Sequence, residues 1–318
     1  MQIYLAPLEG ITGYVFRNAY AKYYGGVDKY FTPFISPHTK KMMDAREKRD
    51  ILPENNEGIC LVPQVLTNNV EDLIELCKKL NDFGYSEVNL NLGCPSKTVT
   101  TKGKGSGFLE YPERLEEFFD RFFKVSDTKL SIKTRIGIDE IEEAQRLFRI
   151  YEKFPFEEVI IHPRLGSEFY SGIPHRDVFE EYLSKTKHRL CYNGDINTIE
   201  DLESLDKQWE KCNDYMIGRG LLFNPALLKG LSGGFSTKEE ELQVFKAFHD
   251  ELVLGYDAYM CGDRNVLFKM KELWGYWSRY FVGQEKLIKK IKKTNTLLEY
   301  RSYVNQIIQS QSDSCIHS

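Results

Sequence analysis

Several common sequence features are missing from this 318-residue chain. No apolar run approaches the roughly 20 residues that a membrane-spanning helix needs. Residues 1–7 have neither the basic region nor the long apolar core of a signal peptide. The seven cysteines show no CxxC spacing, which argues against a disulfide framework and against a structural zinc site. We therefore expect a cytoplasmic, monomeric globular protein that holds no metal.

The charged residues are unevenly distributed along the chain. The formal net charge is −4, but residues 262–308 contain ten Lys or Arg and four Asp or Glu, which gives this segment +6 and leaves −10 for the remainder. The segment is either a solvated helix face or a surface that binds a polyanion. Its densest part, 286–293, contains Lys286, Lys289, Lys290, Lys292 and Lys293.

Short apolar segments and helical patterns alternate through the first 217 residues. The apolar segments end in Gly, Pro, Asn or a charged residue, and helical patterns such as 71–82 and 111–124 separate them. This alternation indicates a parallel sheet, and eight strands favour a closed (β/α)₈ TIM barrel over an open doubly wound sheet. Pro33 weakens the second strand. The predicted strands are 2–6, 30–35, 59–65, 87–91, 129–133, 158–162, 189–193 and 214–217.

The strand pattern stops after Gly233 and Gly234, and we place a domain boundary near 232–236. From Ser236 onward only helical patterns follow, and residues 236–239 form a suitable capped start. We predict a barrel domain at 1–234, a small all-helical C-terminal domain at 235–309 and a flexible polar tail at 310–318. Aromatic residues of the helical domain recur at helical spacing, so most are expected in its core: Trp274, Tyr276, Trp277, Tyr280 and Phe281.

Polar and basic residues occupy the C-terminal ends of at least six predicted strands. Active sites of (β/α)₈ barrels lie at this end, because the loops there are free to carry chemistry. A purely structural barrel interior is filled with branched apolar side chains and does not need such residues. The strand ends therefore predict a site that contains Pro7, Gln64, Asn91, Cys94, Lys133, His162, Asn193, Asp195, Gly218 and Arg219.

Two glycine-containing turns indicate an anionic cofactor. Residues 193–195 (Asn-Gly-Asp) follow the seventh strand and 218–220 (Gly-Arg-Gly) follow the eighth, where barrels of this kind commonly bind phosphate. Glycine lets backbone N–H groups approach a phosphate closely, although the glycines could serve only to form turns. Lys133 lies on an otherwise apolar strand, and a buried lysine is costly unless it faces an anion. That anion is either an acidic neighbour or a ligand such as a reduced flavin ring.

The segment 89–97 (Asn-Leu-Asn-Leu-Gly-Cys-Pro-Ser-Lys) is the most informative motif. Strand alternation puts Asn89 and Asn91 on one face, where Asn91 could contact both a carbonyl and an N–H of a bound base. Cys94 lies between a glycine and a proline at a strand end, a position that displays the thiol rather than burying it in the core. The basic, glycine-rich segment 102–107 is expected to be a mobile loop that closes over a phosphate-bearing substrate.

These residues resemble the tRNA-dihydrouridine synthases over essentially the whole chain. The resemblance rests on seven stretches in order. They are 6–12 (Ala-Pro-Leu-Glu-Gly-Ile-Thr) followed by Phe16-Arg17; Gln64; 91–97; 132–135 (Ile-Lys-Thr-Arg); 161–164 (Ile-His-Pro-Arg); 193–196 (Asn-Gly-Asp-Ile); and 217–220 (Ile-Gly-Arg-Gly). Three departures concern the subfamily. Residues 31–34 lack the acidic residue that is common there, Glu9 stands where many members have a small residue, and the basic loop after Cys94 is richer in glycine than in most members.

The resemblance implies FMN at the barrel mouth, NADPH as the reductant and tRNA, or another structured RNA, as the substrate. Cys94 would be the catalytic acid and Lys133 would contact the N1/O2 side of the flavin. The remaining implied FMN contacts are Pro7, Leu8, Glu9, Gln64, His162, Asn193, Gly194, Asp195, Gly218 and Arg219. The implied substrate contacts are Asn91, Lys97, Arg164 and Tyr170.

The expected reaction is reduction of uridine to 5,6-dihydrouridine, in which a flavin hydride adds to C6 and Cys94 protonates C5. A cysteine acid must stay neutral, so its pKa should not be depressed. One rival is a flavin-dependent dehydrogenase of a free pyrimidine, of the dihydroorotate or dihydropyrimidine type, which would not need a basic helical appendage. The other rival is a non-catalytic RNA-binding barrel, against which Cys94, Lys133 and His162 argue.

Overall fold

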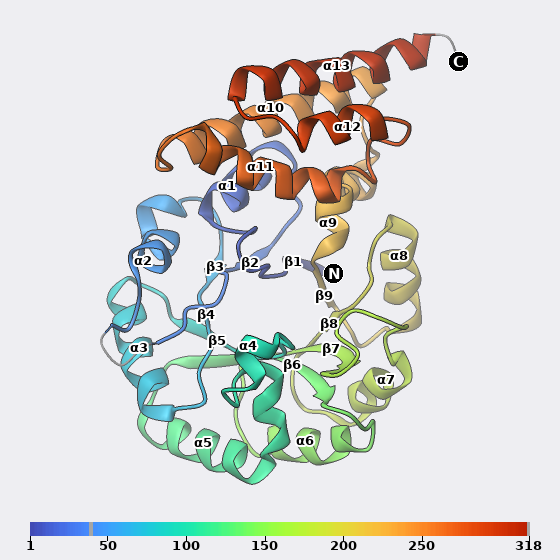
Figure 1. Cartoon of the computed structure of the whole chain (residues 1–318). Helices are drawn as coiled ribbons and strands as arrows, with labels where there is room; N and C mark the ends of the chain where they lie inside the picture. The colour runs from blue at the N-terminus through green and yellow to red at the C-terminus, as the bar shows by residue number, and fades with distance from the viewer. Residues whose placement is uncertain (38–40, 317–318) are drawn as a thin grey trace.

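The computed structural model describes residues 1–37 and 41–316, and side chains as far as residue 312. In this part of the chain, nine parallel strand segments form one sheet in the order β3-β2-β1-β9-β8-β7-β6-β5-β4. Figure 1 shows the strands as a ring surrounded by helices. The strands are β1 Gln2–Leu5, β2 Lys29–Phe31, β3 Leu61–Val62, β4 Gln64–Val65, β5 Glu87–Leu92, β6 Lys129–Gly137, β7 Val159–Leu165, β8 Leu190–Asn193 and β9 Asp214–Ile217.

The two ends of this sheet, β3 and β4, are halves of one chain segment separated only by Pro63. Proline has no N–H to donate, so it interrupts the strand ladder. β3 pairs with β2, and β4 pairs with β5. The ring therefore closes through the segment predicted as the third strand, and the nine segments correspond to the eight predicted strands. The predicted (β/α)₈ barrel is confirmed.

Three of the predicted strands, the second, the fifth and the sixth, end at other residues than predicted. β2 ends at Phe31 rather than at 35, and only Ile35 rejoins the sheet, through a single bridge to Val65. β6 continues to Gly137 rather than ending at 133, and β7 continues to Leu165 rather than ending at 162. The longer β6 carries Arg135 to the mouth of the barrel.

The outer helices bury one apolar face each against the barrel. In α3, the predicted helix 71–82, Leu73, Leu76 and Leu80 are buried, and the side chain of Asn69 caps the first turn. α5 corresponds to the predicted helix 111–124. The helices of the barrel are α1 Tyr14–Tyr23, α2 Ala45–Ile51, α3 Val70–Asp82, α4 Lys97–Thr100, α5 Pro112–Val125, α6 Glu143–Tyr151, α7 Arg176–Lys185, α8 Ile199–Gln208 and α9 Arg219–Phe223, with 3₁₀ turns η1 Pro53–Asn55, η2 Gly105–Glu110 and η3 Leu227–Ser232.

In the described part of the chain, four further helices form a layer against one outer side of the ring, where α10 packs on α1 and α11 packs on α9 (Figure 1). Thr237 caps the start of α10, at the predicted start. Trp274, Trp277 and Phe281 are buried in the core of this layer, as expected from their spacing. The helices are α10 Lys238–Asp257, α11 Asp263–Trp277, α12 Glu285–Ile291 and α13 Leu297–Ile316.

α13 runs to Ile316, so the backbone of the segment predicted as a flexible tail from 310 is helical as far as residue 316. The polar composition of this segment suggested fraying, but it continues a helix that is anchored upstream by buried Tyr300, Val304 and Ile307. Among the residues described, no helix is both long and apolar enough to cross a membrane.

Candidate active site

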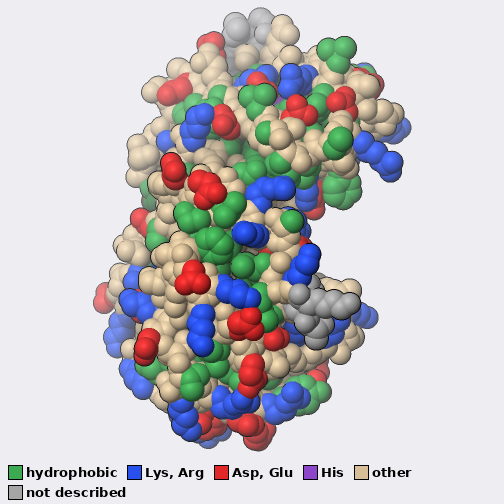
Figure 2. Space-filling view, turned by 90° about the vertical axis from the view of Figure 1, so that its left-hand side faces the viewer, with side chains coloured by type: hydrophobic (Ala, Val, Ile, Leu, Met, Phe, Trp, Pro, Cys, Tyr) green, Lys and Arg blue, Asp and Glu red, His purple; other side chains and the backbone are tan. Residues whose placement is uncertain are grey.

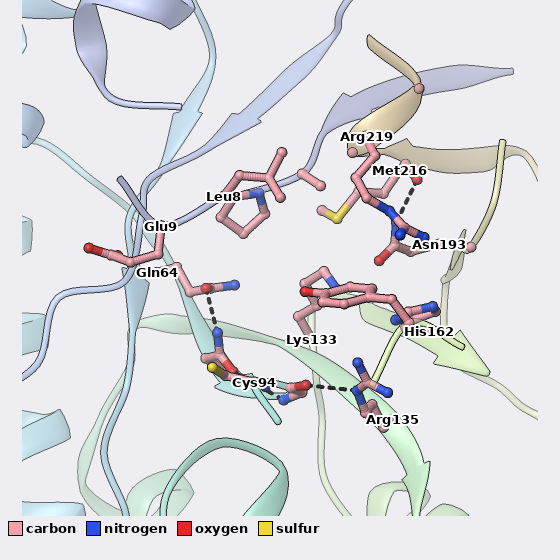
Figure 3. A pocket seen from close by; sticks show the side chains of 18 of the residues that line it. Leu8, Glu9, Gln64, Cys94, Lys133, Arg135, His162, Asn193, Met216 and Arg219 are labelled. Carbon is pink, nitrogen blue, oxygen red and sulfur yellow. Dashed lines mark hydrogen bonds between the residues drawn. The ribbon is translucent and has the colours of Figure 1, made fainter. Parts of the chain in front are cut away.

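A cavity of about 160 Å³ lies at the C-terminal ends of the strands. Fourteen of the sixteen predicted site residues line it; Lys97 and Arg164 do not. Figure 3 shows Gln64 and Cys94 on one side of the cavity, His162 and Arg219 on the other, and Lys133 between them. The predicted residues that line it are Pro7, Leu8, Glu9, Gln64, Asn91, Cys94, Lys133, Tyr170, His162, Asn193, Gly194, Asp195, Gly218 and Arg219.

Lys133 points into this cavity from β6 without a carboxylate partner. Among the described residues, it makes no ion pair within 4.0 Å, so the acidic-neighbour alternative does not hold there. Burial lowers the pKa of Lys133 to about 8, and the positive charge of Arg135 contributes to this shift. A half-buried ammonium with no anion beside it is costly. The cavity is therefore suited to a ligand that brings negative charge.

His162, on β7, lines the cavity in its neutral form. Burial and the nearby cations, Lys133 foremost, hold its pKa well below the ordinary histidine value. Its Nε2 lies 2.9 Å from Nη1 of Arg164. Because a guanidinium can only donate, Nε2 must accept and the ring proton must sit on Nδ1. His162 thus offers one N–H to a ligand and adds no charge.

Arg164 does not face the cavity, contrary to its predicted role as a substrate contact. Its side chain is fully buried and ion-paired with Asp195 through both carboxylate oxygens, at 3.2 and 2.5 Å. It also donates to the carbonyl of Ser171 at 3.0 Å and to that of Gly172 at 2.6 Å. Its N–H groups thus hold Asp195 and the loop after β7 in place instead of contacting a ligand. The sequence did not show this, because the pairing joins strand ends 31 residues apart.

Lys97 is also outside the cavity. It is an exposed residue at the start of α4, so it could meet only a part of the substrate that extends beyond the pocket. Its role as a substrate contact remains a prediction about that outer surface.

The two glycine-containing turns approach the cavity closely, as expected. A Cβ on Gly220 would lie 2.1 Å from the carbonyl oxygen of Ile196, so only glycine fits where the two turns meet. Asp195 has a positive φ of 44°, a conformation that is uncommon outside glycine but that Asp adopts more readily than most residues. Arg219 Nη2 holds its carboxylate at 2.9 Å. The backbone of both turns is thus fixed around a cavity wall that can receive a phosphate.

Asn91 shapes the turn that carries Cys94. Its Oδ1 accepts the backbone N–H groups of Gly93 and Cys94 at 3.0 and 2.9 Å. Its Nδ2 donates to Gln64 Oε1 at 2.8 Å. The predicted contact with both a carbonyl and an N–H of a base is therefore not available, because the oxygen already has two donors. One N–H of Asn91 remains for a ligand.

The thiol of Cys94 lies half-buried at the edge of the cavity. Burial raises its pKa, an effect that the charges of Arg135 and Lys133 only partly offset. A raised pKa keeps the thiol protonated near neutral pH, as an acid requires.

The glycine-rich segment after Cys94 is packed beneath it rather than standing open. Ser106 donates to the carbonyl of Cys94 through both its backbone N–H and its hydroxyl, at 3.0 and 3.1 Å. A Cβ on Gly105 would lie 2.6 Å from that same carbonyl oxygen. The glycines at 105 and 107 are thus required by close packing, an explanation that differs from the expected mobile loop.

Arg135 is the main site residue that was not predicted as a contact. It donates to the carbonyls of Gly93 at 2.9 Å and of Leu165 and Phe169 at 2.6 Å each, so it ties the Cys94 turn to the loop after β7. Tyr170, on that loop, places its ring 4.7 Å from the guanidinium of Arg219 and lines the cavity, and its role as a substrate contact stays a prediction. Strand alternation from Ser131 and Lys133 would have placed Arg135 inward, but the predicted strand ended too early.

Glu9 is turned partly outward. It pairs with Arg46 at 3.0 Å, and burial raises its pKa despite this partner. Because β2 ends at Phe31, Pro33 and Phe34 lie outside the strand, and they line the cavity next to Glu9.

No cluster of three or more potential metal ligands occurs among the described residues.

Comparison with known proteins identifies the family of the chain. Residues 4–309 match the family model described as dihydrouridine synthase (Dus). A probable tRNA-dihydrouridine synthase of Staphylococcus epidermidis is 27% identical, over 95% of this chain and 92% of that protein. A tRNA-dihydrouridine(16) synthase of Pseudomonas syringae pv. tomato is also 27% identical, over 75% of this chain and 77% of that protein. The solved structure of morphinone reductase superimposes with a TM-score of 0.52 over 78% of this chain and 88% of that one, and at 13% identity this likeness concerns the fold alone. The chain belongs to the dihydrouridine synthase family.

Proposed function

We propose that this protein reduces uridine to 5,6-dihydrouridine in tRNA, with FMN as its cofactor and NADPH as the reductant. The observation that carries the proposal is that one cavity contains both Lys133, which has no anionic partner among the described residues, and the thiol of Cys94, whose pKa is raised. Lys133 favours an anionic ligand, and the protonated thiol can supply a proton.

The residues present fit FMN. The turns at 193–195 and 218–220, with Arg219, would hold the phosphate, and His162 would donate from Nδ1 to an oxygen nearby. Lys133 would face the negative side of the ring, while Pro7, Leu8, Glu9 and Gln64 would border it. When bound, FMN would supply the hydride that adds to C6 of uracil, and NADPH would reduce the oxidised flavin again.

Cys94 would give its proton to C5 of the uracil. The thiol is held at a fixed place because Asn91 and Ser106 bond the backbone on both sides of it. After transfer, the thiolate lies in the field of Arg135 and Lys133, whose charges stabilise it. Tyr170 stands at the rim, where its exposed ring can cover the base.

An RNA substrate accounts for the basic helical layer, which a free pyrimidine would not need. Lys286, Lys289, Lys290, Lys292 and Lys293 are exposed on and just after α12. Figure 2 shows Lys and Arg side chains on this layer and at the waist between it and the barrel. Contacts of these cations with phosphates would offset the few kcal/mol needed to extrude a base from its stack. A tRNA substrate would place the protein in the cytoplasm.

The proposal is tested with purified protein that has been reconstituted with FMN. We expect a flavin absorption spectrum with about one FMN per chain, and NADPH-dependent dihydrouridine in a tRNA transcript when its nucleosides are analysed by mass spectrometry. Free uracil and orotate serve as competing substrates. Bound flavin with turnover of the free pyrimidine alone would instead identify a pyrimidine dehydrogenase, and a protein that binds no flavin would end the oxidoreductase proposal.

A further inference from the structure

Inside the barrel, polar side chains replace the apolar filling along β4, β5 and β6. Gln64 on β4 pairs in register with Asn89 on β5, which pairs with Ser131 on β6. All three are fully buried. Glu87 and Asn91 lie one layer below and one layer above Asn89 on the same face of β5.

These side chains form a continuous series of hydrogen bonds that ends at Cys94. Asn91 Oδ1 accepts from the backbone N–H of Cys94, and Asn91 Nδ2 donates to Gln64 Oε1 at 2.8 Å. Gln64 Nε2 donates to Asn89 Oδ1 at 2.8 Å, and Asn89 Nδ2 donates to Ser131 Oγ at 3.0 Å.

At its lower end the series reaches a carboxylate. Ser131 Oγ donates to Glu87 Oε1 at 2.7 Å, and Lys29 Nζ donates to Glu87 Oε2 at 3.2 Å. A carboxylate only accepts hydrogen bonds. Ser131 must therefore give its single proton to Glu87, and its oxygen must accept from Asn89.

We propose that Glu87, Ser131, Asn89 and Gln64 are positioning residues for Cys94, because they fix which way the Asn91 amide faces. An amide has an oxygen at one end and an NH₂ at the other, and either order can be packed into nearly the same space. Here the acceptor-only carboxylate at one end and the donor-only backbone N–H groups at the other require the same order in all three amides.

A break in the series removes one of these two constraints. Without the Ser131 hydroxyl, Asn89 loses its acceptor, and the order of the three amides is then held only by the N–H groups of Gly93 and Cys94 on Asn91 Oδ1. In the fraction of molecules with the amides inverted, Asn91 would turn its NH₂ against these N–H groups, and the turn would open. Ser106 and Arg135 still hold the two flanking carbonyls, so the turn should loosen rather than unfold. Removal of one hydrogen bond corresponds to about a two- to tenfold effect on a rate that depends on the thiol position.

The proposal rests on the proposed function only in giving Cys94 the role of acid, and the decisive measurement needs neither flavin nor RNA. Protein labelled with [¹⁵N]cysteine gives one backbone amide resonance for each cysteine, and that of Cys94 is assigned by its loss in Cys94→Ala. We expect this resonance to move in Ser131→Ala and to return to its native position in Ser131→Thr, which keeps the hydroxyl. Glu87→Gln should move it less, because the new amide can accept or donate, and this isosteric variant carries the test if Ser131→Ala does not fold.

Thr134→Val is the matched control, since Thr134 is a buried hydroxyl on the same strand whose bonds go to Tyr151 and the carbonyl of Arg135 instead. In the holoenzyme, Ser131→Ala should lower kcat for dihydrouridine formation about two- to tenfold with KM for tRNA unchanged. A Cys94 resonance in Ser131→Ala and Glu87→Gln that coincides with the Thr134→Val position would show that the series does not reach Cys94. Absence of dihydrouridine in the wild type would count against the proposed function alone.

Discussion

Among the described residues, Lys29 and Lys133 point into this barrel from opposite ends, and their surroundings are opposite. Lys29, at the lower end, lies 3.2 Å from Glu87 and 3.5 Å from Glu158. Burial lowers its pKa, but these two carboxylates outweigh that effect and leave the pKa raised. Lys133, at the mouth, has no such partner among the described residues, and its pKa falls to about 8.

The lower end thus supplies carboxylates to its lysine, which the described residues of the mouth do not, although burial at the lower end raises the pKa of Glu158 to about 7. Tyr4 donates to Glu158 at 2.7 Å, and Arg189 pairs with Asp214, which closes the lower cluster. At the mouth, the carboxylate of Asp195 is held by two arginines and that of Glu9 by a third, so neither of them compensates Lys133. Lys29 is paired with carboxylates, whereas Lys133 has no anion beside it among the described residues. This difference indicates that a negatively charged ligand binds at the mouth.

The largest expected effect is the loss of activity in Cys94→Ala, which tests the chemistry at the mouth of the barrel and not the packing below it. Cys94→Ala should lower dihydrouridine formation by about 100- to 10,000-fold, the usual contribution of a general acid. FMN content and NADPH oxidation should persist, because the thiol is not part of the phosphate or ring contacts. The rate is measured on a tRNA transcript under single-turnover conditions.

Cys212→Ala is the matched control, since this thiol is buried just before β9 and far from the mouth in the barrel. It should cost stability and leave the turnover rate unchanged. Wild-type turnover by Cys94→Ala would mean that the proton comes from another group.

The second prediction tests the asymmetry of the lysines directly. Lys133→Met should weaken FMN binding about 10- to 100-fold, because it removes a charged hydrogen-bond donor from the anionic ring. Titration of the apoprotein, followed by quenching of flavin fluorescence, gives the affinity.

Lys29→Met should instead destabilise the fold by about 3 kcal/mol, because Glu87 would lose its ion pair and Glu158 would keep only Arg189 as a cationic partner. Among molecules that remain folded, its FMN affinity should equal that of the wild type. Equal losses of FMN affinity in the two variants would remove the distinction between the two ends.

The sequence predicted the barrel and most of the cavity because both depend on local patterns. Apolar segments bounded by Gly, Pro and Asn placed the strands, and their ends placed Cys94, Lys133 and His162 at the mouth. Whether a lysine is paired depends on residues far away in the chain, such as Glu158 for Lys29. The burial of Arg164 and the turn formed by Asn91 likewise depend on side-chain directions that alternation alone does not give.

The third prediction concerns the exposed cations of the helical layer. Replacement of Lys289, Lys290 and Lys293 by Gln should weaken tRNA binding. The slope of log K against log salt should fall by somewhat under one unit for each of these lysines that pairs with a phosphate in the wild type. FMN affinity should not change. The matched control replaces Lys78, Lys207 and Lys211, which are exposed on the barrel, so that the same charge is removed. Equal slopes for the two triple variants would identify the α12 lysines as a solvated helix face.

The smallest expected effect is the pH dependence of the flavin-free protein. In the unfolded chain Lys133 titrates near its ordinary value of 10.5, whereas in the folded protein its pKa is about 8. Between these values the unfolded state binds more protons, so the contribution of Lys133 makes the free energy of unfolding rise with pH from about 8 to 10.5. Lys133→Met should therefore be more stable than the wild type at pH 7, and this advantage should shrink by pH 10.

Lys29 should show the opposite trend. Its pKa is raised in the folded protein, so its stabilising contribution is fully present below pH 10.5 and disappears as the pH rises further. Urea titrations of the Lys133→Met and Lys29→Met variants from pH 7 to about pH 12 measure the two trends, since that of Lys29 begins only above 10.5. Bound FMN should abolish the trend of Lys133 and leave that of Lys29, because only the lysine at the mouth gains a partner. A trend for Lys133 that persists with FMN bound would mean that the flavin does not meet this ammonium.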